Sequence, residues 1–485
     1  MKAIKNKPKV HYFQFENWMN DPNGLVVKDG IYHLFYQANP DSKYWGNIGW
    51  GHATSEDLIT WQDRPHALNA SKNQMIFSGS AISSDNLLGY QEELIAFYTA
   101  CDYEVSDTEE FIVKKQSQCI AISDKSGNIW KHFEKNPVLD IDSSEFRDPK
   151  VIKLANNSWL MLVSRAREHA IDFYMSSNLV SWNLYSSFTD CNFRRGAWEC
   201  PDLIPLSFDG ITKHVLIISV DDGFQSGGSG VIYIIGQFEN GHFIPDNAQK
   251  LSQNYVVLDK GSDFFAPQSF SYEVKSRSAV ILGWLNNWQY AKLMPSKGLP
   301  MLQSVPRELG LVKSQSGALL LSQTPINSVF EYFNSSHVCK AASIEKQFSE
   351  IGKGINGCFM FTVQLNLEKS AGYELNISME RETLLKIVID EEKNKIFIER
   401  TDNDLFENTL NLFESSFTPI NDILDIVVIG DYYSFEVFIN KNTEVFSIRS
   451  HRYFDNLILS HKTLQKVSRY IYQDLKTHLP VKLKY

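Results

Sequence analysis

The alternation of apolar and polar residues predicts a protein built almost entirely of β-strands. Short apolar runs recur through the first two thirds of the chain, and turn-forming clusters separate them; examples are residues 31–37, 94–100, 158–164 and 213–220. The 3.6-residue periodicity of long amphipathic helices is missing from this pattern. An all-β fold is therefore predicted, and parallel α/β folds are disfavoured.

A motif that ends on tryptophan recurs three times in this region. It reads SEDLITW at residues 55–61, SNLVSW at 177–182, and SDKSGNIW in a longer variant at 123–130. Each copy follows a strand-like run, and the tryptophans are spaced by roughly 50 to 70 residues, about the size of one four-stranded propeller blade. The repeat predicts a β-propeller in which each tryptophan packs between neighbouring blades.

The character of the sequence changes near residues 306–308. Residues 330–342 are polar and irregular, and the tail then alternates with a period of two, as in residues 358–367, 395–400 and 435–439. Such alternation is typical of half-exposed antiparallel strands in a β-sandwich. We predict a propeller over residues 1–328, a sandwich over 340–485, and a short amphipathic helix over 464–475.

Composition limits the classes of partner. The chain has 485 residues, and 13% of them are aromatic, which requires large buried faces, a site that stacks sugar rings, or both. Because the net charge is −10, nucleic acid and anionic membranes are disfavoured, since both need basic patches. A neutral small-molecule substrate fits this charge, and one basic pocket would be enough for a phosphorylated sugar.

The N-terminus and the cysteines favour a cytoplasmic protein. Met1 is followed by a lysine-rich segment without the apolar stretch of a signal peptide, and no apolar run reaches the length of a membrane-spanning helix. The six cysteines lack the C-x-x-C spacing of metal sites. We therefore expect free thiols in a reducing compartment, no metal and no membrane partner.

Three carboxylates stand out because each lies where an apolar run begins. Asp21 lies in WMNDPNG (residues 18–24), where D-P-N-G predicts a turn and the apolar flanks place Asn20 and Asp21 at the mouth of a strand. Asp148 follows Arg147, whose charge would keep it ionised, although a surface ion pair is the simpler alternative. Glu199 lies among Trp, Cys and Pro, an apolar setting that raises the pKa of a carboxyl and suits a general acid.

A propeller would bring these three acids together, because equivalent strand ends of all blades face the central funnel. Two carboxylates that flank the scissile bond are the minimal requirement for glycoside hydrolysis. One must be ionised and nucleophilic, and the other must hold a proton for the leaving oxygen. A third fixed carboxylate stabilises the positively charged transition state.

These motifs, taken in order, resemble glycoside hydrolase family 32, which holds invertases, exo-fructanases and sucrose-6-phosphate hydrolases. The resemblance is carried by residues 18–24 (WMNDPNG), 35–37 (FYQ), 45–46 (WG), 50–52 (WGH), 55–58 (SEDL), 76–80 (IFSGS), 146–149 (FRDP), 198–202 (WECPD), 262–268 (SDFFAPQ), 283–288 (GWLNNW), 306–309 (PREL) and 435–440 (FEVFIN).

The resemblance implies a five-bladed β-propeller followed by a C-terminal β-sandwich. It implies that Asp21 is the nucleophile, Glu199 the acid/base and Asp148 a transition-state stabiliser, in a retaining mechanism that needs no metal or organic cofactor. The terminal fructose would be held by Asn20, Gln37, Trp45, Phe77, Ser78, Arg147 and Trp288. Cys200 would tune Glu199 by packing.

The substrate remains open at this level. We expect a β-fructofuranosidase that acts on sucrose, with levan, inulin and sucrose 6-phosphate as alternatives, and with transfer to a sugar competing with hydrolysis. Residues 290–301 depart from the pattern of many relatives, which have a second tryptophan there, so the rim of the funnel is expected to differ. A non-catalytic carbohydrate-binding propeller and a homo-oligomer are further alternatives.

Overall fold

The structure is a computed structural model. It describes residues 7–84, 86–91, 94–107, 111–125, 127–154, 158–190, 193–224, 227–246, 256–271, 279–333, 336–339, 349–367, 372–401, 411–463 and 469–474. The chain divides into two compact units, one made of residues 14–258 and 265–304, the other of 1–13, 259–264 and 305–485. Strands dominate both units, so the all-β prediction is confirmed. None of the helices in the described ranges has the length and apolar character needed to cross a membrane.

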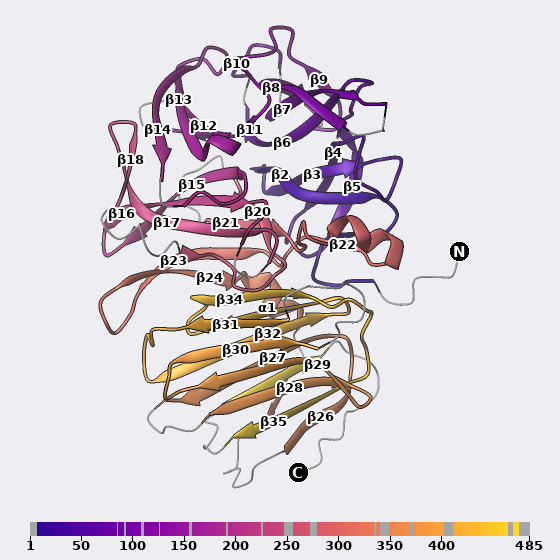
Figure 1. The fold of residues 1–485 in the computed structure, drawn as a ribbon, viewed down its shortest axis with the longest axis vertical. Coiled ribbons are helices and arrows are strands. Elements are labelled where there is room, and N and C mark those ends of the chain that lie inside the picture. Colours follow the sequence, from indigo (N-terminus) through magenta and orange to yellow (C-terminus); the bar gives the residue numbers. More distant parts are fainter. Residues whose placement is uncertain are drawn as a thin grey trace. The chain divides into compact units, whose positions relative to one another are not determined.

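The unit formed by residues 14–258 and 265–304 contains successive antiparallel sheets (Figure 1). Four of them are complete within it: β2 (Trp18–Lys28), β3 (Ile31–Asn39), β4 (Gly49–Ser55) and β5 (Gln62–Leu68); β6 (Gln74–Ser83), β7 (Leu94–Val105), β8 (Phe111–Ser123), β9 (Trp130–His132) and β10 (Leu139–Ser143); β11 (Phe146–Lys153), β12 (Trp159–Arg165), β13 (Ala170–Ser176) and β14 (Asn183–Thr189); β15 (Trp198–Phe208), β16 (Ile211–Val220), β17 (Gly230–Glu239), β18 (His242–Pro245) and β19 (Val256–Val257). The remaining elements are β20 (Phe265–Ser269) paired with β21 (Val280–Trp284), β22 (Met301–Leu302), and the 3-10 helices η1 (Ala166–Glu168) and η2 (Ala291–Lys297).

The first strands of these sheets form a cyclic series of contacts. β2 contacts β6, β6 contacts β11, β11 contacts β15, β15 contacts β20, and β20 contacts β2. Apolar side chains fill the space between successive sheets: one buried cluster joins β6–β8 to β11–β13, and another joins β12 and β13 to β15–β17. Residues far apart in sequence are therefore brought to one central region.

The three tryptophan motifs adopt one local structure. In each copy the indole Nε1 donates to the carbonyl three residues earlier, at 3.2 Å for Trp61, 3.1 Å for Trp130 and 2.9 Å for Trp182. The Trp130 ring meets Phe35 of the preceding sheet edge-on with centroids 5.3 Å apart, and Trp182 meets Phe97 in the same way at 6.2 Å. For these two copies, the predicted packing of tryptophan between neighbouring sheets is confirmed.

The other unit is built around two six-stranded antiparallel sheets that share one apolar core. Its elements are β23 (Arg307–Lys313), β24 (Leu319–Pro325), α1 (Asn327–Tyr332), β25 (Ser336–Cys339), β26 (Ser349–Ile355), β27 (Cys358–Asn366), β28 (Tyr373–Met379), β29 (Glu382–Asp390), β30 (Lys395–Arg400), β31 (Leu412–Ser416), β32 (Ile423–Asp431), β33 (Ser434–Ile439), β34 (Glu444–Arg449), β35 (Leu457–Thr463) and β36 (Arg469–Asp474), and β1 (Phe13–Gln14) spans its N-terminal boundary. The strands predicted from period-two alternation are β27, β30 and β33.

The predicted C-terminal helix is wrong where the structure describes it. Residues 469–474 form β36, which pairs with β27 on one side and β25 on the other. The backbone N–H and C=O groups on both sides of this segment are paired with neighbouring strands. This pairing outweighs the weak helical pattern of the sequence. The rest of the predicted helix lies outside the described residues.

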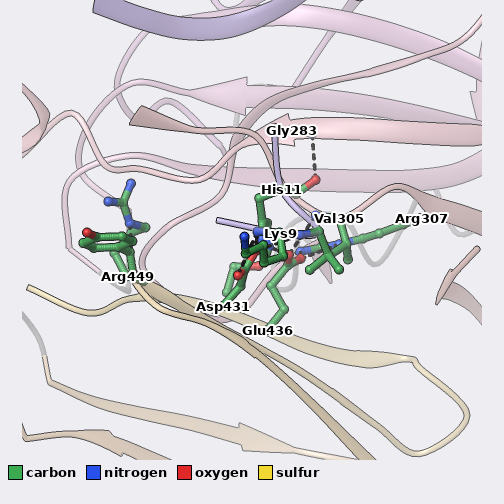
Figure 2. Close-up of polar contacts among 12 residues, drawn as sticks. Lys9, His11, Gly283, Val305, Arg307, Asp431, Glu436 and Arg449 are labelled. Carbon is green, nitrogen blue, oxygen red and sulfur yellow. Dashed lines mark hydrogen bonds and ion pairs between the residues drawn. The ribbon is translucent and has the colours of Figure 1, made fainter. Parts of the chain in front are cut away.

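A network of buried charges joins residues of the same unit (Figure 2). The His11 ring lies between two carboxylates, with Nδ1 2.8 Å from Asp431 Oδ2 and Nε2 2.8 Å from Glu436 Oε1. Arg307 pairs with Glu436 and donates to Asp259 Oδ2 at 2.9 Å. Burial lowers the pKa of His11, but the two carboxylates outweigh it and raise the pKa to about 9. The buried charges therefore compensate one another.

Candidate active site

Every strand of the central series carries an irregularity near its start. The register with the next strand shifts by one residue between Met19 and Pro22 in β2, Phe77 and Gly79 in β6, Arg147 and Lys150 in β11, Glu199 and Asp202 in β15, and Phe265 and Gln268 in β20. These are β-bulges, which bend a strand and re-aim one side chain. A proline follows the bulged position in four of them, where its missing N–H costs the ladder little.

The predicted D-P-N-G turn is therefore wrong. Residues 21–24 continue through strand β2 as two bulges, with Gly24 at a φ of 53°. The equivalent bulge residues Asp148, Cys200 and Ala266 have φ values of 67°, 47° and 48°, a left-handed conformation that costs free energy in residues other than glycine. The bulge holds Asp148 in this strained conformation. Positioning its carboxylate therefore lowers the stability of the fold at this residue.

Asp21 lies in a buried polar environment. Its Oδ2 accepts a hydrogen bond from Ser78 Oγ at 2.7 Å, and its Oδ1 accepts one from Asn20 Nδ2 at 2.9 Å. Burial raises the pKa of Asp21, and the bonds from Ser78, Asn20 and Cys200 oppose that effect by stabilising the ionised form. The carboxylate is thus held in a fixed orientation with its ionised form supported by donors.

Asp148 is fixed by two backbone groups and a hydroxyl. Its Oδ2 accepts from the Cys200 N–H at 2.9 Å, and its own N–H donates to Thr99 Oγ1 at 2.9 Å. Burial and the charge of Asp21 raise its pKa to about 6, against the opposing charge of Arg147. The three acids are close enough to influence one another's ionisation.

Glu199 is held by Arg147 from the neighbouring sheet. Arg147 donates to Glu199 Oε1 from Nε at 3.1 Å and from Nη2 at 2.9 Å, and its Nη1 donates to Glu145 Oε2 at 2.7 Å. Burial raises the pKa of Glu199 to about 8, with contributions from the Asp148 and Asp21 charges, while Arg147 opposes the shift. A carboxyl with this pKa holds its proton at neutral pH, as a general acid must.

Cys200 connects the three carboxylates. Its N–H donates to Asp148, its Sγ lies 3.5 Å from Asp21 Oδ2, and it directly follows Glu199 in β15. Burial and the three surrounding carboxylates raise the pKa of its thiol well above the usual value, so the thiol stays protonated and can donate. Strands β2, β11 and β15 thus place Asp21, Asp148 and Glu199 around one residue.

The predicted polar binding residues lie beside the acids. Gln37 Nε2 donates to the Ile76 carbonyl at 3.1 Å. With the Asn23 amide oriented to match its neighbours, its nitrogen donates to Ser78 Oγ at 3.3 Å and its oxygen accepts from Gln37 Nε2 at 2.8 Å. Together with Asn20, these residues form one connected network around Asp21, whereas Arg147 bonds to Glu199, Glu145 and Gln116.

The predicted aromatic residues are half-buried, so each keeps part of its surface free for a ligand. Trp288 packs against Trp18 with ring centroids 6.2 Å apart and against Trp284 at 4.9 Å. Trp45 lies in the loop between β3 and β4, and Phe77 lies at the bulge of β6. Polar groups at the acids and aromatic faces around them are the composition expected of a sugar site.

Some residues of the site were not assigned from the sequence. Glu145 and Gln116 hold Arg147, and Thr99 holds Asp148. Below the acids, Lys150 Nζ lies 3.0 Å from Asp202 Oδ2, and both side chains are buried. Lys150 and Asp202 each lie two residues after a bulge position, and this shared spacing is the signal that could have identified the pair. Among the described residues, no group of His, Cys, Asp and Glu has the arrangement of a metal site.

Comparisons with known proteins show which family this chain belongs to. A levanase from Bacillus subtilis (strain 168) is 33% identical over 458 residues, which cover 90% of this chain and 65% of the levanase. The chain thus spans just under two thirds of that relative.

Solved structures extend the likeness to the whole fold. The exo-inulinase of Aspergillus awamori superposes with a TM-score of 0.86 at 27% identity, covering 98% of this chain and 100% of that chain. A fructofuranosidase of Schwanniomyces occidentalis complexed with fructose gives a TM-score of 0.83 at 27% identity, covering 97% and 98%. Residues 11–325 match the family model described as Glycosyl hydrolases family 32 N-terminal domain. The chain therefore belongs to glycoside hydrolase family 32.

Proposed function

We propose that this protein is a retaining β-fructofuranosidase that releases the terminal non-reducing fructose of a fructoside. The observation that carries the proposal is the meeting of Asp21, Asp148 and Glu199 from three strands around Cys200 and Arg147. The family and the fructose bound to the solved fructofuranosidase support a small sugar as the substrate. The retaining course predicts that the nucleophile and acid carboxyls are about 5 Å apart.

In the first step, Asp21 attacks the anomeric carbon of the terminal fructose while Glu199 gives its proton to the glycosidic oxygen. The bond to the leaving group breaks, and a fructosyl ester of Asp21 forms. In the second step, Glu199 removes a proton from water, the resulting hydroxide attacks the same carbon, and Asp21 leaves as a carboxylate. Asp148 stabilises the positive charge of both transition states.

The architecture proposed for this activity is a five-bladed β-propeller over residues 1–328, followed by a β-sandwich over 340–485. The cyclic contacts of β2, β6, β11, β15 and β20 support the propeller, and the shared core of the two six-stranded sheets supports the sandwich. In such a propeller the starts of the five inner strands surround one funnel, which explains why residues as distant as Asp21 and Glu199 act on one bond.

Sucrose and fructans are the two candidate substrates. Sucrose is the substrate that we expect from the sequence. The likeness to a levanase and to an exo-inulinase favours fructans as the second candidate.

The test is the release of glucose from sucrose, and of fructose from inulin and levan, by the wild type and by Asp21→Ala. We expect the loss of the nucleophile to lower kcat by at least about a thousandfold. NMR of the first product should show retention at the anomeric carbon. Equal rates for the two proteins would refute the role of Asp21, early inversion would refute the retaining course, and no release from any fructoside would favour a sugar-binding protein.

A further inference from the structure

A cavity of about 360 Å³ lies at the end of the strands opposite to the acids. Lys28, which lines it, ends β2, the strand on which Asp21 lies near the start. Leu94, which also lines it, begins β7, whose later residue Thr99 bonds to Asp148. Along an extended strand these separations are roughly 15 to 20 Å. The cavity is therefore a second concave site of small-molecule size, distinct from the acids.

The lining of this cavity is positively charged. Lys28, Arg64 and Lys125 contribute three positive charges against the one negative charge of Asp29. The chain as a whole has a net charge of −10, so this excess of cations is local. Because grouped like charges repel one another, a concave group of cations on an acidic protein is the arrangement expected where an anion binds.

Arg64 and Lys125 have no carboxylate partner among the residues that the structure describes. Arg64 donates from Nε to Thr54 Oγ1 at 2.8 Å and from Nη2 to Gln62 Oε1 at 3.2 Å, and both acceptors are neutral. Lys125 has neither a hydrogen bond nor an ion pair within the described ranges, and both cations are exposed. The planar guanidinium fork matches two oxygens of a phosphate, and an ammonium group adds a point charge beside it. The two cations are therefore available to a phosphate group.

His33 offers a hydrogen-bond donor to the same cavity. Its Nδ1 lies 3.0 Å from Nε2 of His52, so one hydrogen is shared between the two rings, and burial together with the charge of Arg64 lowers the pKa of His33 to about 4. The buried Nδ1 of His52 has no hydrogen-bond partner in the described part of the chain. The shared hydrogen belongs to His52, because the other tautomer would bury an N–H without an acceptor. The neutral ring of His33 therefore carries its own hydrogen on Nε2, from which it can donate to a ligand.

The rest of the lining suits the organic part of a ligand. Ile31 and Leu94 contribute apolar surface, and Thr54 and Asn128 contribute a hydroxyl group and an amide. A bare anion would leave these groups without contacts, whereas the carbon skeleton and the hydroxyl groups of a sugar would use both kinds.

From these observations we infer that the cavity binds a small phosphate ester of about the size of a hexose phosphate. Arg64 and Lys125 bind the phosphate oxygens, His33 donates to one of them, and the body of the ester lies on Ile31 and Leu94. The inference does not rest on the proposed fructosidase activity, because the cavity and the acids lie at opposite ends of the strands.

The experiment is calorimetry at constant ionic strength with glucose 6-phosphate, inorganic phosphate and glucose. We expect the wild type to bind one glucose 6-phosphate per chain, more tightly than inorganic phosphate, and to show no measurable binding of glucose. Arg64→Met should weaken the affinity for the ester about tenfold or more, and Lys125→Met about threefold to tenfold, because each removes a charge-assisted contact. Arg64→Lys keeps the charge and should lose less. Arg167→Met is the matched control, because it removes an arginine whose side chain is 58% exposed in the same unit.

Three calorimetric results would overturn the inference. The first is an affinity for glucose 6-phosphate that is the same in the wild type, Arg64→Met and Lys125→Met, which would place the ester at another site. The second is the absence of saturable binding by the wild type at about 10 mM glucose 6-phosphate. The third is equal affinity for glucose 6-phosphate and inorganic phosphate, which would reduce the cavity to a site for a bare anion.

A spectroscopic readout tests the contribution of His33. The Nε2 signal of His33 in proton–nitrogen NMR spectra should move when glucose 6-phosphate is added to the wild type, and it should stay in place when glucose is added. A signal that does not move at saturation with the ester would exclude His33 as a donor and refute this arrangement of the site.

Discussion

Replacing Arg147 by methionine should move the pH dependence of catalysis to higher pH. Arg147 donates to Glu199 Oε1 from two nitrogens, at 2.9 and 3.1 Å. Its positive charge stabilises the ionised form of Glu199 and so holds the pKa of this carboxyl below the value that burial alone would give. Without the cation, the acid form of Glu199 persists to higher pH.

The size of the shift follows from the geometry. Two unit charges about 4 Å apart at an effective dielectric constant of about 20 interact by about 4 kcal/mol, or roughly 3 pKa units. Because the side chains of Arg147 and Glu199 are 11% and 18% exposed, solvent screens part of this interaction. We expect the basic limb of the profile to rise by about 1 to 2 pH units. The acidic limb should rise as well, since Arg147 also lowers the pKa of Asp148.

The assay is kcat/KM on sucrose between pH 4 and about 10, which reports the ionisations of the free enzyme. Arg147→Lys keeps the charge without the planar fork and should shift the limbs less than Arg147→Met. Arg452→Met is the matched control, because Arg452 pairs with Glu382 at 2.8 Å in the other unit. A basic limb that stays in place or moves to lower pH in Arg147→Met would refute the assignment of that limb to Glu199.

Three further predictions concern Cys200, Lys150 and His11. Cys200→Ala removes a donor to Asp21 and should raise the pKa of that carboxyl and the acidic limb of the pH profile, whereas Cys200→Ser should restore the limb. Lys150→Met leaves the buried Asp202 unpaired and should lower the free energy of unfolding in urea by about 3 to 5 kcal/mol, with much of the loss recovered in Lys150→Met/Asp202→Leu. The pKa of His11 rises from 6.5 to about 9 on folding. The protonated ring should therefore contribute roughly 3 kcal/mol to the free energy of unfolding below pH 6.5, and this contribution should disappear as the pH rises through 9. Urea unfolding at several pH values measures it as the difference in the free energy of unfolding between the wild type and His11→Gln.

Each of these has a contrary result. An acidic limb that is the same in Cys200→Ala and the wild type would exclude the thiol as a donor to Asp21. A double variant no more stable than Lys150→Met would show that the penalty is not the unpaired Asp202 charge. A stability difference between the wild type and His11→Gln that stays constant from pH 6 to about 10 would contradict the raised pKa of His11.

The strands and the three acids could be predicted because their signals are local. Period-two alternation fixes which face of β27 or β30 is buried, whatever the rest of the chain does. The acids were found because each lies at the start of an apolar run, one or two residues before a proline. The tryptophan motif could be recognised because its structure is local: the indole donates to a carbonyl three residues earlier.

What could not be predicted depends on contacts between distant segments. The bulges of β2 replace the expected turn where Asp21 bonds to Ser78 and Asn20 to Gln303, both far along the chain. The bond from Arg147 to Glu199 joins two sheets, and the sequence indicated only that Arg147 precedes Asp148. Likewise, the Lys9 N–H donates to Asp431 at 2.8 Å across a sequence separation of 422 residues. Nothing local to either end of such a contact reveals its partner.

The bulges near the starts of the five central strands separate the role of the backbone, which positions a residue, from that of the side chain, which supplies the chemistry. Asp148, Cys200 and Ala266 have the same left-handed backbone conformation at matching positions of β11, β15 and β20, and register shifts near the starts of β2 and β6 accompany Asp21 and Ser78. The backbone at each position is held by the pairing of its strand with the next strand of the sheet, whatever side chain it carries. Ala266 is the one residue of these five without a polar side chain, so a designer who wants a fifth functional group at a bulge position should begin there.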